Sequence, residues 1–151
     1  MDARTLGLFA AGGSLLLIAG AWMFEFMGYP PCKMCHWQRW PHYIAIVLGV
    51  LIFLRPKEIY YLLGSTAAFV TSAVGVFHTG VEKGWWEGPS SCTGSGALSG
   101  LSGADLLSTD GDFLVMCDQV SWAFLGVSMA SWNAIFSAGL VLIWIAAAKR
   151  A

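Results

Sequence analysis

The feature that most constrains this chain is a set of apolar runs long enough to cross a lipid bilayer. The first extends from Leu6 to Met27 and carries no charged residue before Glu25. A helix rises about 1.5 Å per residue and the hydrocarbon core is about 30 Å thick, so roughly 20 apolar residues make one span. Of all residues, 57% are hydrophobic and 11% are charged, against about 25% charged in soluble domains. The sequence therefore predicts an integral membrane protein.

Three further apolar runs complete the membrane domain. The run from Tyr43 to Leu54 is too short alone, and extending it upstream to Cys35 gives 20 residues, or about 30 Å of helix. A very short turn around Pro56 makes its neighbouring spans antiparallel. The sequence thus predicts an all-α membrane protein, a four-transmembrane-helix up-down bundle in a single domain over residues 1–151. The expected spans are residues 6–27, 35–54, 59–77 and 129–148, with two outer loops at 28–34 and 79–122.

A cleaved signal peptide is the alternative for the first run, because Arg4 precedes an apolar stretch with small residues. The run is longer than the roughly 7 to 15 residues of a signal h-region, and no clear small-x-small cleavage site precedes Pro30. We therefore interpret it as a membrane span.

The orientation follows from the basic residues near the span ends, which favour the cytoplasmic side. If both termini are cytoplasmic, five basic residues lie inside and three outside. The inner set is Arg4, Arg55, Lys57, Lys149 and Arg150, and the outer set is Lys33, Arg39 and Lys83. This arrangement predicts a multi-pass membrane protein with all four cysteines on one outer face.

Polar and small residues within the spans suggest how the helices associate. Asn133, inside the fourth run, predicts an interhelical hydrogen bond. Small residues are expected where helices approach closely, as at Gly12, Gly13, Gly49, Gly75 and Gly139. The middle of the spans holds no Asp, Glu, Lys or Arg, which argues against an ion-coupled transporter. A net charge of -1 without a basic run gives no sign of nucleic-acid binding.

The chemistry of the chain centres on Cys32 and Cys35, a Cys-x-x-Cys pair at the outer edge of the second span. Two thiols at this spacing can close a small disulfide ring and suit two-electron exchange. The spacing also suits half of a zinc site, completed by the other cysteines or by His36. Since Cys92 and Cys117 lack the knuckle spacing that zinc sites commonly show, we expect no metal.

The second cysteine pair lies in a long outer loop that is rich in Gly and Ser and is expected to be mobile. Four cysteines permit three pairings. Pairing Cys32 with Cys35 and Cys92 with Cys117 needs the least reorganisation, and exchange between the pairs would follow if the loop reaches the CxxC. The alternative is that the loop bridge is purely structural.

Three groups of residues together resemble the bacterial disulfide bond formation protein B (DsbB) family, and the resemblance covers essentially the whole chain. They are Cys32-x-x-Cys35-x-x-Gln38-Arg39-x-Pro41; Phe77-His78 through Glu82, Trp85-Trp86 and Pro89 to Cys92; and Cys117-Asp118 followed by Trp122, Gly126 and Asn133. The order of these motifs differs from the related vitamin K epoxide reductases, in which the loop cysteines precede the CxxC.

The resemblance implies a four-helix inner-membrane oxidoreductase that makes disulfides. Such a protein reoxidises a reduced, DsbA-like periplasmic thioredoxin-fold partner and passes the electrons to a membrane quinone, ubiquinone or menaquinone. By motif, Cys92 and Cys117 are the partner-facing pair, with Cys92 forming the mixed disulfide. Cys32 and Cys35 are the quinone-proximal pair, with Cys35 meeting the quinone.

The local chemistry is consistent with those roles. Cys35 would lie at a helix N-terminus, where the helix dipole stabilises a thiolate, so we expect an unusually acidic Cys35 thiol. Arg39 lies one turn deeper on the same face and would stabilise negative charge that develops on a quinone; its alternative role is that of an interfacial anchor. His78, at the exit of the third span, is a weaker candidate for the quinone pocket or a proton relay. His36, His42 and Glu25 carry less weight.

Two other classes of function remain open from the sequence. One is a membrane protein with two purely structural disulfides, and the other is a DsbB-like paralogue dedicated to one partner. Thiol trapping of the four cysteines with and without quinone depletion tests the first class. Trapping of a covalent partner complex through Cys92 in a Cys117→Ser variant tests the second.

Overall fold

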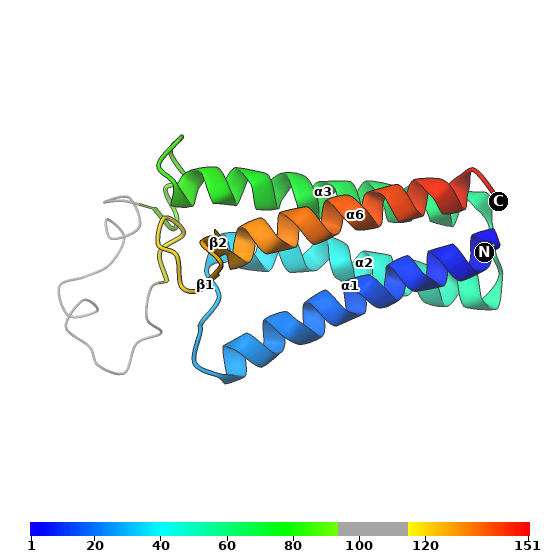
Figure 1. Cartoon of the computed structure of the whole chain (residues 1–151), viewed down its shortest axis with the longest axis horizontal. Coiled ribbons are helices and arrows are strands. Elements are labelled where there is room, and N and C mark those ends of the chain that lie inside the picture. The colour runs from blue at the N-terminus through cyan, green and yellow to red at the C-terminus, as the bar shows by residue number, and fades with distance from the viewer. Residues whose placement is uncertain (94–114) are drawn as a thin grey trace.

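The structure is a computed structural model that describes residues 1–93 and 115–151. Four long helices lie side by side, as Figure 1 shows: α1 (Ala3–Phe26), α2 (Lys33–Leu54), α3 (Glu58–Glu82) and α6 (Met129–Ala148). All four are long and apolar enough to cross a membrane. The predicted all-α membrane bundle is therefore confirmed. The expected mobility of the Gly- and Ser-rich loop concerns mainly residues 94–114, which lie outside the described residues.

The two chain termini lie at one end of the bundle, and the loop that follows α3 lies at the other (Figure 1). A short antiparallel hairpin of β1 (Ala123–Phe124) and β2 (Val127–Ser128) leads directly into α6. Ser128 is the N-cap of α6, and its hydroxyl accepts a hydrogen bond from the Ser131 N–H at 3.2 Å, which satisfies one of the free donors of the first turn.

Helix α3 continues five residues beyond the expected span end at residue 77, so the expected loop at 79–122 begins only after Glu82. The helix stops at Gly84, which adopts a φ of +66°. The Trp85 N–H donates to Gly80 O at 2.9 Å and the Gly84 N–H to Val81 O at 3.1 Å, the paired bonds of a Schellman C-cap. The prediction from hydropathy placed the helix end too early, because the glycine that ends the helix, Gly84, lies beyond the apolar run.

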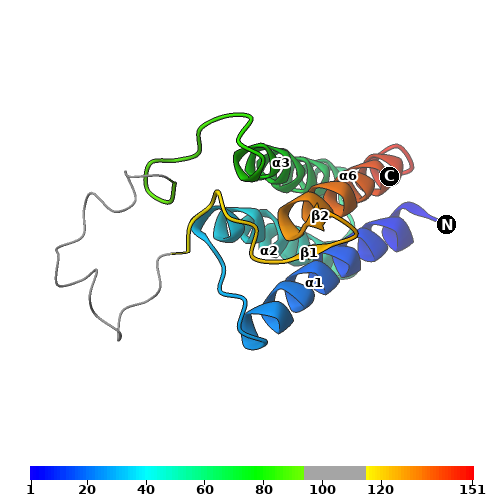
Figure 2. The ribbon, with the colours of Figure 1, turned by 60° about the vertical axis from the view of Figure 1, so that its left-hand side comes forward.

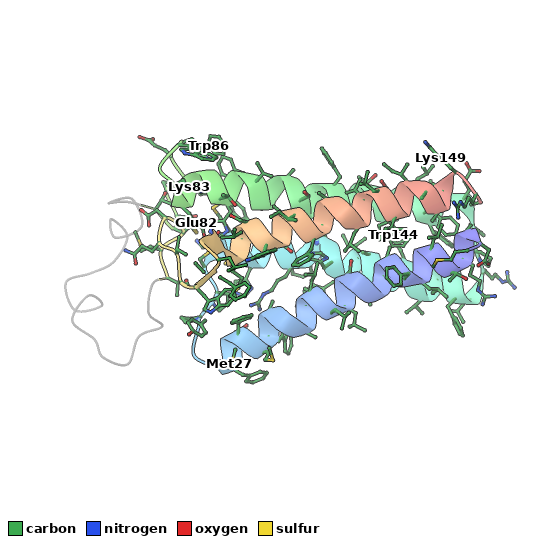
Figure 3. All side chains as sticks on the ribbon, in the orientation of Figure 1. Met27, Glu82, Lys83, Trp86, Trp144 and Lys149 are labelled. Atoms are coloured by element: carbon green, nitrogen blue, oxygen red, sulfur yellow. A yellow bond between two sulfur atoms is a disulfide. The ribbon has the colours of Figure 1, made fainter. Side chains whose placement is uncertain are left out.

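Helix α1 leans away from the other three helices toward the end that carries the cysteines, and Figures 1 and 2 show this from two directions. Near the termini α1 is tightly packed. A Cβ added at Gly49 of α2 would lie 2.3 Å from the Ala11 Cβ, and one added at Gly7 would lie 2.7 Å from the Tyr61 ring. Trp144 is fully buried in the same half of the bundle (Figure 3) and rests on Gly64.

The expected close contacts at small residues hold for three of the five glycines. Gly13, Gly49 and Gly75 each meet a neighbouring helix, whereas a Cβ added at Gly12 or Gly139 has nothing within 4 Å. The prediction of close approach at Gly12 and Gly139 is therefore wrong, because these two faces point away from the described neighbours.

Replacing Gly49 by Val should destabilise the bundle by about 1–3 kcal/mol, because the added methyl groups force α1 and α2 apart. The measurement is the unfolding free energy in mixed micelles titrated with a denaturing detergent. Gly139→Val in α6 is the matched control and should change this free energy by about 0.5 kcal/mol or less. Equal losses in the two variants would contradict the close contact.

Candidate redox site

The CxxC pair forms the first turn of α2. Cys32 is the N-cap, and its Sγ accepts a hydrogen bond from the Cys35 N–H at 3.3 Å, as a side-chain oxygen does in most caps. The two sulfurs are free thiols 3.1 Å apart. The preceding Pro30 and Pro31 keep the chain extended up to the cap. The helix thus begins two residues before the expected start, and Cys35 lies in its first turn as expected.

The second pair, Cys92 and Cys117, forms a disulfide. The Cys117 N–H also donates to Cys92 O at 2.7 Å, so backbone and side chains both join these segments. Both cysteines are buried, and they belong to one cluster with Cys32, Met34 and Val81, against which Cys35 packs. The two cysteine pairs are therefore neighbours in one buried cluster, although they lie far apart in the sequence.

His78 comes from the last turns of α3 and faces the CxxC pair. Its Nε2 lies 3.5 Å from Cys32 Sγ, and its Nδ1 lies 2.8 Å from Gln38 Nε2. Glu82, one turn later on α3, places Oε1 4.0 Å from His78 Nε2 and accepts a hydrogen bond from the Ser128 hydroxyl. Figure 3 shows Glu82 at the end of the bundle opposite Lys149. His78 and Glu82 are both largely buried.

Arg39 lies one turn beyond Cys35 on α2 and crosses to α1. Its Nη1 donates to Glu25 Oε2 at 2.7 Å, and the Arg39 side chain is 11% exposed. Sequence reasoning gave Glu25 little weight, yet this carboxylate is the partner of the predicted Arg39. The pairing keeps the guanidinium hydrogen-bonded beside a largely apolar wall.

A cavity of about 400 Å³ opens beside these residues, between α1, α2, the hairpin region and α6. Most of its wall is apolar, from Leu16 to Phe24 on α1 and from Met129 to Phe136 on α6. Its polar groups include Cys35, Arg39 and His78, together with Cys32, Gln38, His42, Glu82 and Asn133. The sequence did not indicate which tryptophans approach such a site; Trp122 and Trp132 line this cavity.

The model of the family described as disulfide bond formation protein DsbB matches residues 3–147. The chain belongs to the DsbB family. Several relatives that match most of the chain carry the name disulfide bond formation protein B. The one from Xanthomonas oryzae pv. oryzae (strain MAFF 311018) is 29% identical over 165 residues, covering 97% of this chain and 88% of the relative. Those from Polaromonas sp. (strain JS666 / ATCC BAA-500) and Acidovorax sp. (strain JS42) are each 27% identical, covering 99% and 88% of this chain and 95% and 79% of the relatives.

No solved structure matches this chain. Membership of the DsbB family, with four candidate membrane spans, makes the chain a multi-pass inner-membrane protein and a disulfide-generating oxidoreductase. The structure brings five of the six predicted site residues, Cys32, Cys35, His78, Cys92 and Cys117, together around the start of α2. Arg39 lies one turn away.

Within this DsbB-family site the acidic thiol is Cys32. Its pKa is lowered from 9.0 to about 4, chiefly by the hydrogen bond from the Cys35 thiol and further by His78, against the opposing effect of burial. The expectation that Cys35 is the acidic thiol is therefore wrong. The cap geometry adds a smaller contribution in the same direction, because the Cys35 N–H of the first turn points at Cys32 Sγ.

The lowered pKa of Cys32 should be visible in the pH dependence of the CxxC reduction potential. The Cys32 thiolate stabilises the reduced pair fully above pH 9, and this advantage is lost as the pH falls toward 4. Between those limits the reduced pair keeps one proton, on Cys35, so the potential should fall by about 30 mV per pH unit. Two ordinary thiols would give about 59 mV, twice the single-proton slope.

The measurement is redox equilibration with a thiol couple between pH 5 and 8, followed by mass spectrometry of each cysteine pair. The Cys92 and Cys117 pair is the internal control and should follow the two-proton slope. A two-proton slope for the CxxC pair as well would contradict an ionised Cys32.

Proposed function

We propose that this protein oxidises a DsbA-like periplasmic dithiol partner and passes the two electrons through Cys92–Cys117 and then Cys32–Cys35 to a membrane quinone. The observation that carries this proposal is the position of the CxxC pair. The pair shares a buried cluster with the Cys92–Cys117 disulfide, and both of its cysteines also line the apolar cavity. A dithiol in this position suits transfer of two electrons from the Cys92–Cys117 pair to an acceptor in the cavity.

The placement of the termini supports an orientation with the cysteines in the periplasm. Both termini lie at the end remote from the cysteines (Figure 1). The expected cytoplasmic basic residues, including Arg4 and Arg150, belong to that end, where Arg4 donates to Phe53 O and Arg150 to Met1 O. An excess of Lys and Arg favours the cytoplasmic side.

The relay consists of thiolate attacks on disulfides. A partner thiolate attacks Cys92 Sγ, and Cys117 leaves as the thiolate. The second partner thiol then attacks the mixed disulfide, so the partner becomes oxidised and Cys92 and Cys117 become a dithiol. That dithiol reduces the Cys32–Cys35 disulfide by the same exchange.

Partner attack requires a change around the loop disulfide, because Cys92 is only 2% exposed. A partner thiol must approach the attacked sulfur in line with the bond that breaks. We infer that the segment carrying Cys92 moves outward from the Val81 and Cys32 cluster when the partner binds. This movement would also separate the two cysteine pairs and delay back-transfer.

The cavity fits a quinone in size and polarity. Its volume of about 400 Å³ falls within the roughly 300–1,000 Å³ of small-molecule sites, and its wall is mostly apolar. A bound quinone supplies an acceptor for two electrons and two protons. Arg39 holds positive charge beside the site, where it favours negative charge on an acceptor oxygen, and Glu25 keeps the guanidinium in place. His78 holds its ring against Cys32, and Cys35 presents the sulfur that the family pattern assigns to the acceptor.

Replacing Cys117 by Ser should trap the partner. The variant keeps Cys92 as a nucleophile but lacks the thiol that resolves the mixed disulfide. Mass spectrometry of complexes isolated from cells with non-reducing electrophoresis should identify a thioredoxin-fold protein bound through Cys92. Cys92→Ser is the matched control and should give no such complex. A chain whose disulfides are purely structural, the alternative reading, would give no complex with either variant.

Replacing Arg39 by Ala should slow quinone reduction by at least about tenfold, while leaving formation of the partner complex unchanged. Removal of a hydrogen-bond donor that directly contacts a developing oxyanion costs about 10²–10³ in rate, and Arg39 already shares its charge with Glu25. The measurement is quinol formation with reduced partner as electron donor. Lys33→Ala, which removes an exposed cation near the same helix end, is the control. Equal turnover in Arg39→Ala and the unaltered protein would show that Arg39 is only an interfacial anchor.

A further inference from the structure

A chain of hydrogen-bonded polar side chains links α2, α3 and α6 inside the apolar bundle and ends at Cys32. Buried polar groups are costly in such surroundings unless every partner is provided. The chain runs through His42, Asn133, Thr71, Gln38 and His78. All of these except the half-buried Asn133 are buried. Thiol–disulfide exchange at the cysteines does not by itself require these hydrogen bonds. We therefore ask which group donates and which accepts in each of them.

The direction is set by Thr71 on α3. Its hydroxyl donates to the backbone oxygen of Gln38 at 2.9 Å, and a carbonyl oxygen can only accept. The Thr71 Oγ1 therefore has lone pairs left, and it accepts from Asn133 Nδ2 at 3.1 Å. This fixes the Asn133 amide with its nitrogen toward Thr71. Its oxygen then faces His42, whose Nε2 lies 3.0 Å away and donates.

The same amide nitrogen orients Gln38. Asn133 Nδ2 donates its second hydrogen to Gln38 Oε1 at 2.7 Å, so the Gln38 amide nitrogen is turned toward His78. Gln38 Nε2 lies 2.8 Å from His78 Nδ1 and donates to it. A nitrogen that accepts this bond carries no proton, so a neutral His78 ring carries its proton on Nε2. That nitrogen is the one 3.5 Å from Cys32 Sγ.

We propose that Thr71, Asn133 and Gln38, here called the amide ladder, are positioning residues that fix the tautomer of His78 so that its Nε2–H points at Cys32 Sγ. The hydrogen bond then favours the thiolate over the thiol at Cys32. The ladder acts only through His78, since its three members do not contact the sulfur. The inference rests on the proposed function only for its effect on electron transfer.

The amide ladder also bears on whether Cys32, Cys35 and His78 would bind a metal ion or stabilise a thiolate. Cys32 Sγ, Cys35 Sγ and a ring nitrogen of His78 lie within 4.8 Å of one another, a spacing that would suit a thiophilic metal ion. A metal-bound imidazole normally donates its other N–H to an acceptor. Here Gln38 places a donor on Nδ1, and Nε2 presents a proton to the sulfur in place of a lone pair. The arrangement therefore favours thiolate stabilisation over metal binding.

The direct test is ¹⁵N NMR of the reduced, histidine-labelled protein in micelles, without quinone or partner. His78 should show a protonated Nε2 and an unprotonated Nδ1, with its signals assigned by their loss in His78→Gln. Thr71→Val removes the hydroxyl at nearly constant volume and should give a mixture of both tautomers. Thr71→Ser keeps the hydroxyl and should restore the single tautomer. Ser72→Ala is the matched control, because it removes a neighbouring bond from α3 to α6, Ser72 Oγ to Ala134 O at 2.9 Å.

A second readout is the pH profile of the alkylation rate of Cys32 in the reduced protein, located by peptide mass spectrometry. Thr71→Val should move the pH of half-maximal rate upward by about one unit, because the lost hydrogen bond raises the pKa of Cys32 by about one. Thr71→Ser and Ser72→Ala should react like the unaltered protein. If Thr71 had a merely structural role, Thr71→Val would give the same pH profile as Thr71→Ser and Ser72→Ala.

Gln38→Glu keeps the inference testable if Thr71→Val does not fold. A carboxylate in place of the amide donor accepts a hydrogen bond, so His78 Nδ1 should become protonated. A protonated Nδ1 in the unaltered protein would overturn the inference, and so would an unprotonated Nδ1 in Gln38→Glu. If the NMR result is as expected but the unaltered protein reduces no quinone, the proposed function fails and the ladder stands.

Discussion

The contact between Cys32 Sγ and His78 Nε2, 3.5 Å long, joins the start of α2 to the last turns of α3, and the geometry of the site depends on it. Both residues are held in place because their helices, α2 for Cys32 and α3 for His78, extend beyond the apolar runs of the sequence. Helix α2 begins at Lys33 because Cys32 acts as its N-cap, and α3 continues past His78 until Gly84 ends it. If either helix followed hydropathy alone, the sulfur and the imidazole would belong to flexible loop ends and not to rigid helices.

Charge at this end of the bundle is held in pairs and hydrogen bonds. Arg39 of α2 meets Glu25 of α1, and His78 and Glu82 of α3 lie within 4.0 Å of each other. Glu82 is further held by Ser128, which also caps α6. One hydroxyl therefore ties the start of α6 to the carboxylate beside the redox site. Since isolated charges are costly in an apolar environment, these partners are what allow ionisable groups so near the lipid.

The sequence predicted the parts of this protein that depend on average properties of long segments. Four spans follow from hydropathy because the bilayer selects for length and apolarity. The chemistry of the cysteines follows from spacing and motif, and Asn133 was correctly expected to bond across helices. The acidic thiol was misplaced on Cys35, because the contacts of Cys32 with the Cys35 thiol and with His78 depend on side-chain geometry that the spacing does not fix. Glu82 and Glu25 were missed as partners, since their roles depend on side-chain pairs that no periodicity reveals; the i, i+4 spacing of His78 and Glu82 was the one local signal.

The lean of α1 connects these details to the cavity. Near the termini, the Gly49 and Ala11 contact lets α1 and α2 touch. Toward the cysteines, α1 separates from its neighbours and is tied to α2 by polar contacts, Arg39 to Glu25 and Trp22 Nε1 to Tyr43 Oη at 3.2 Å. Glu25 is 45% exposed, so this ion pair contributes only about 0–1 kcal/mol. Apolar packing at the terminal end therefore holds α1 in the bundle, while the weak polar ties set its position at the cavity. An apolar cavity beside a buried dithiol is possible here because packing is concentrated at the opposite end of the helix.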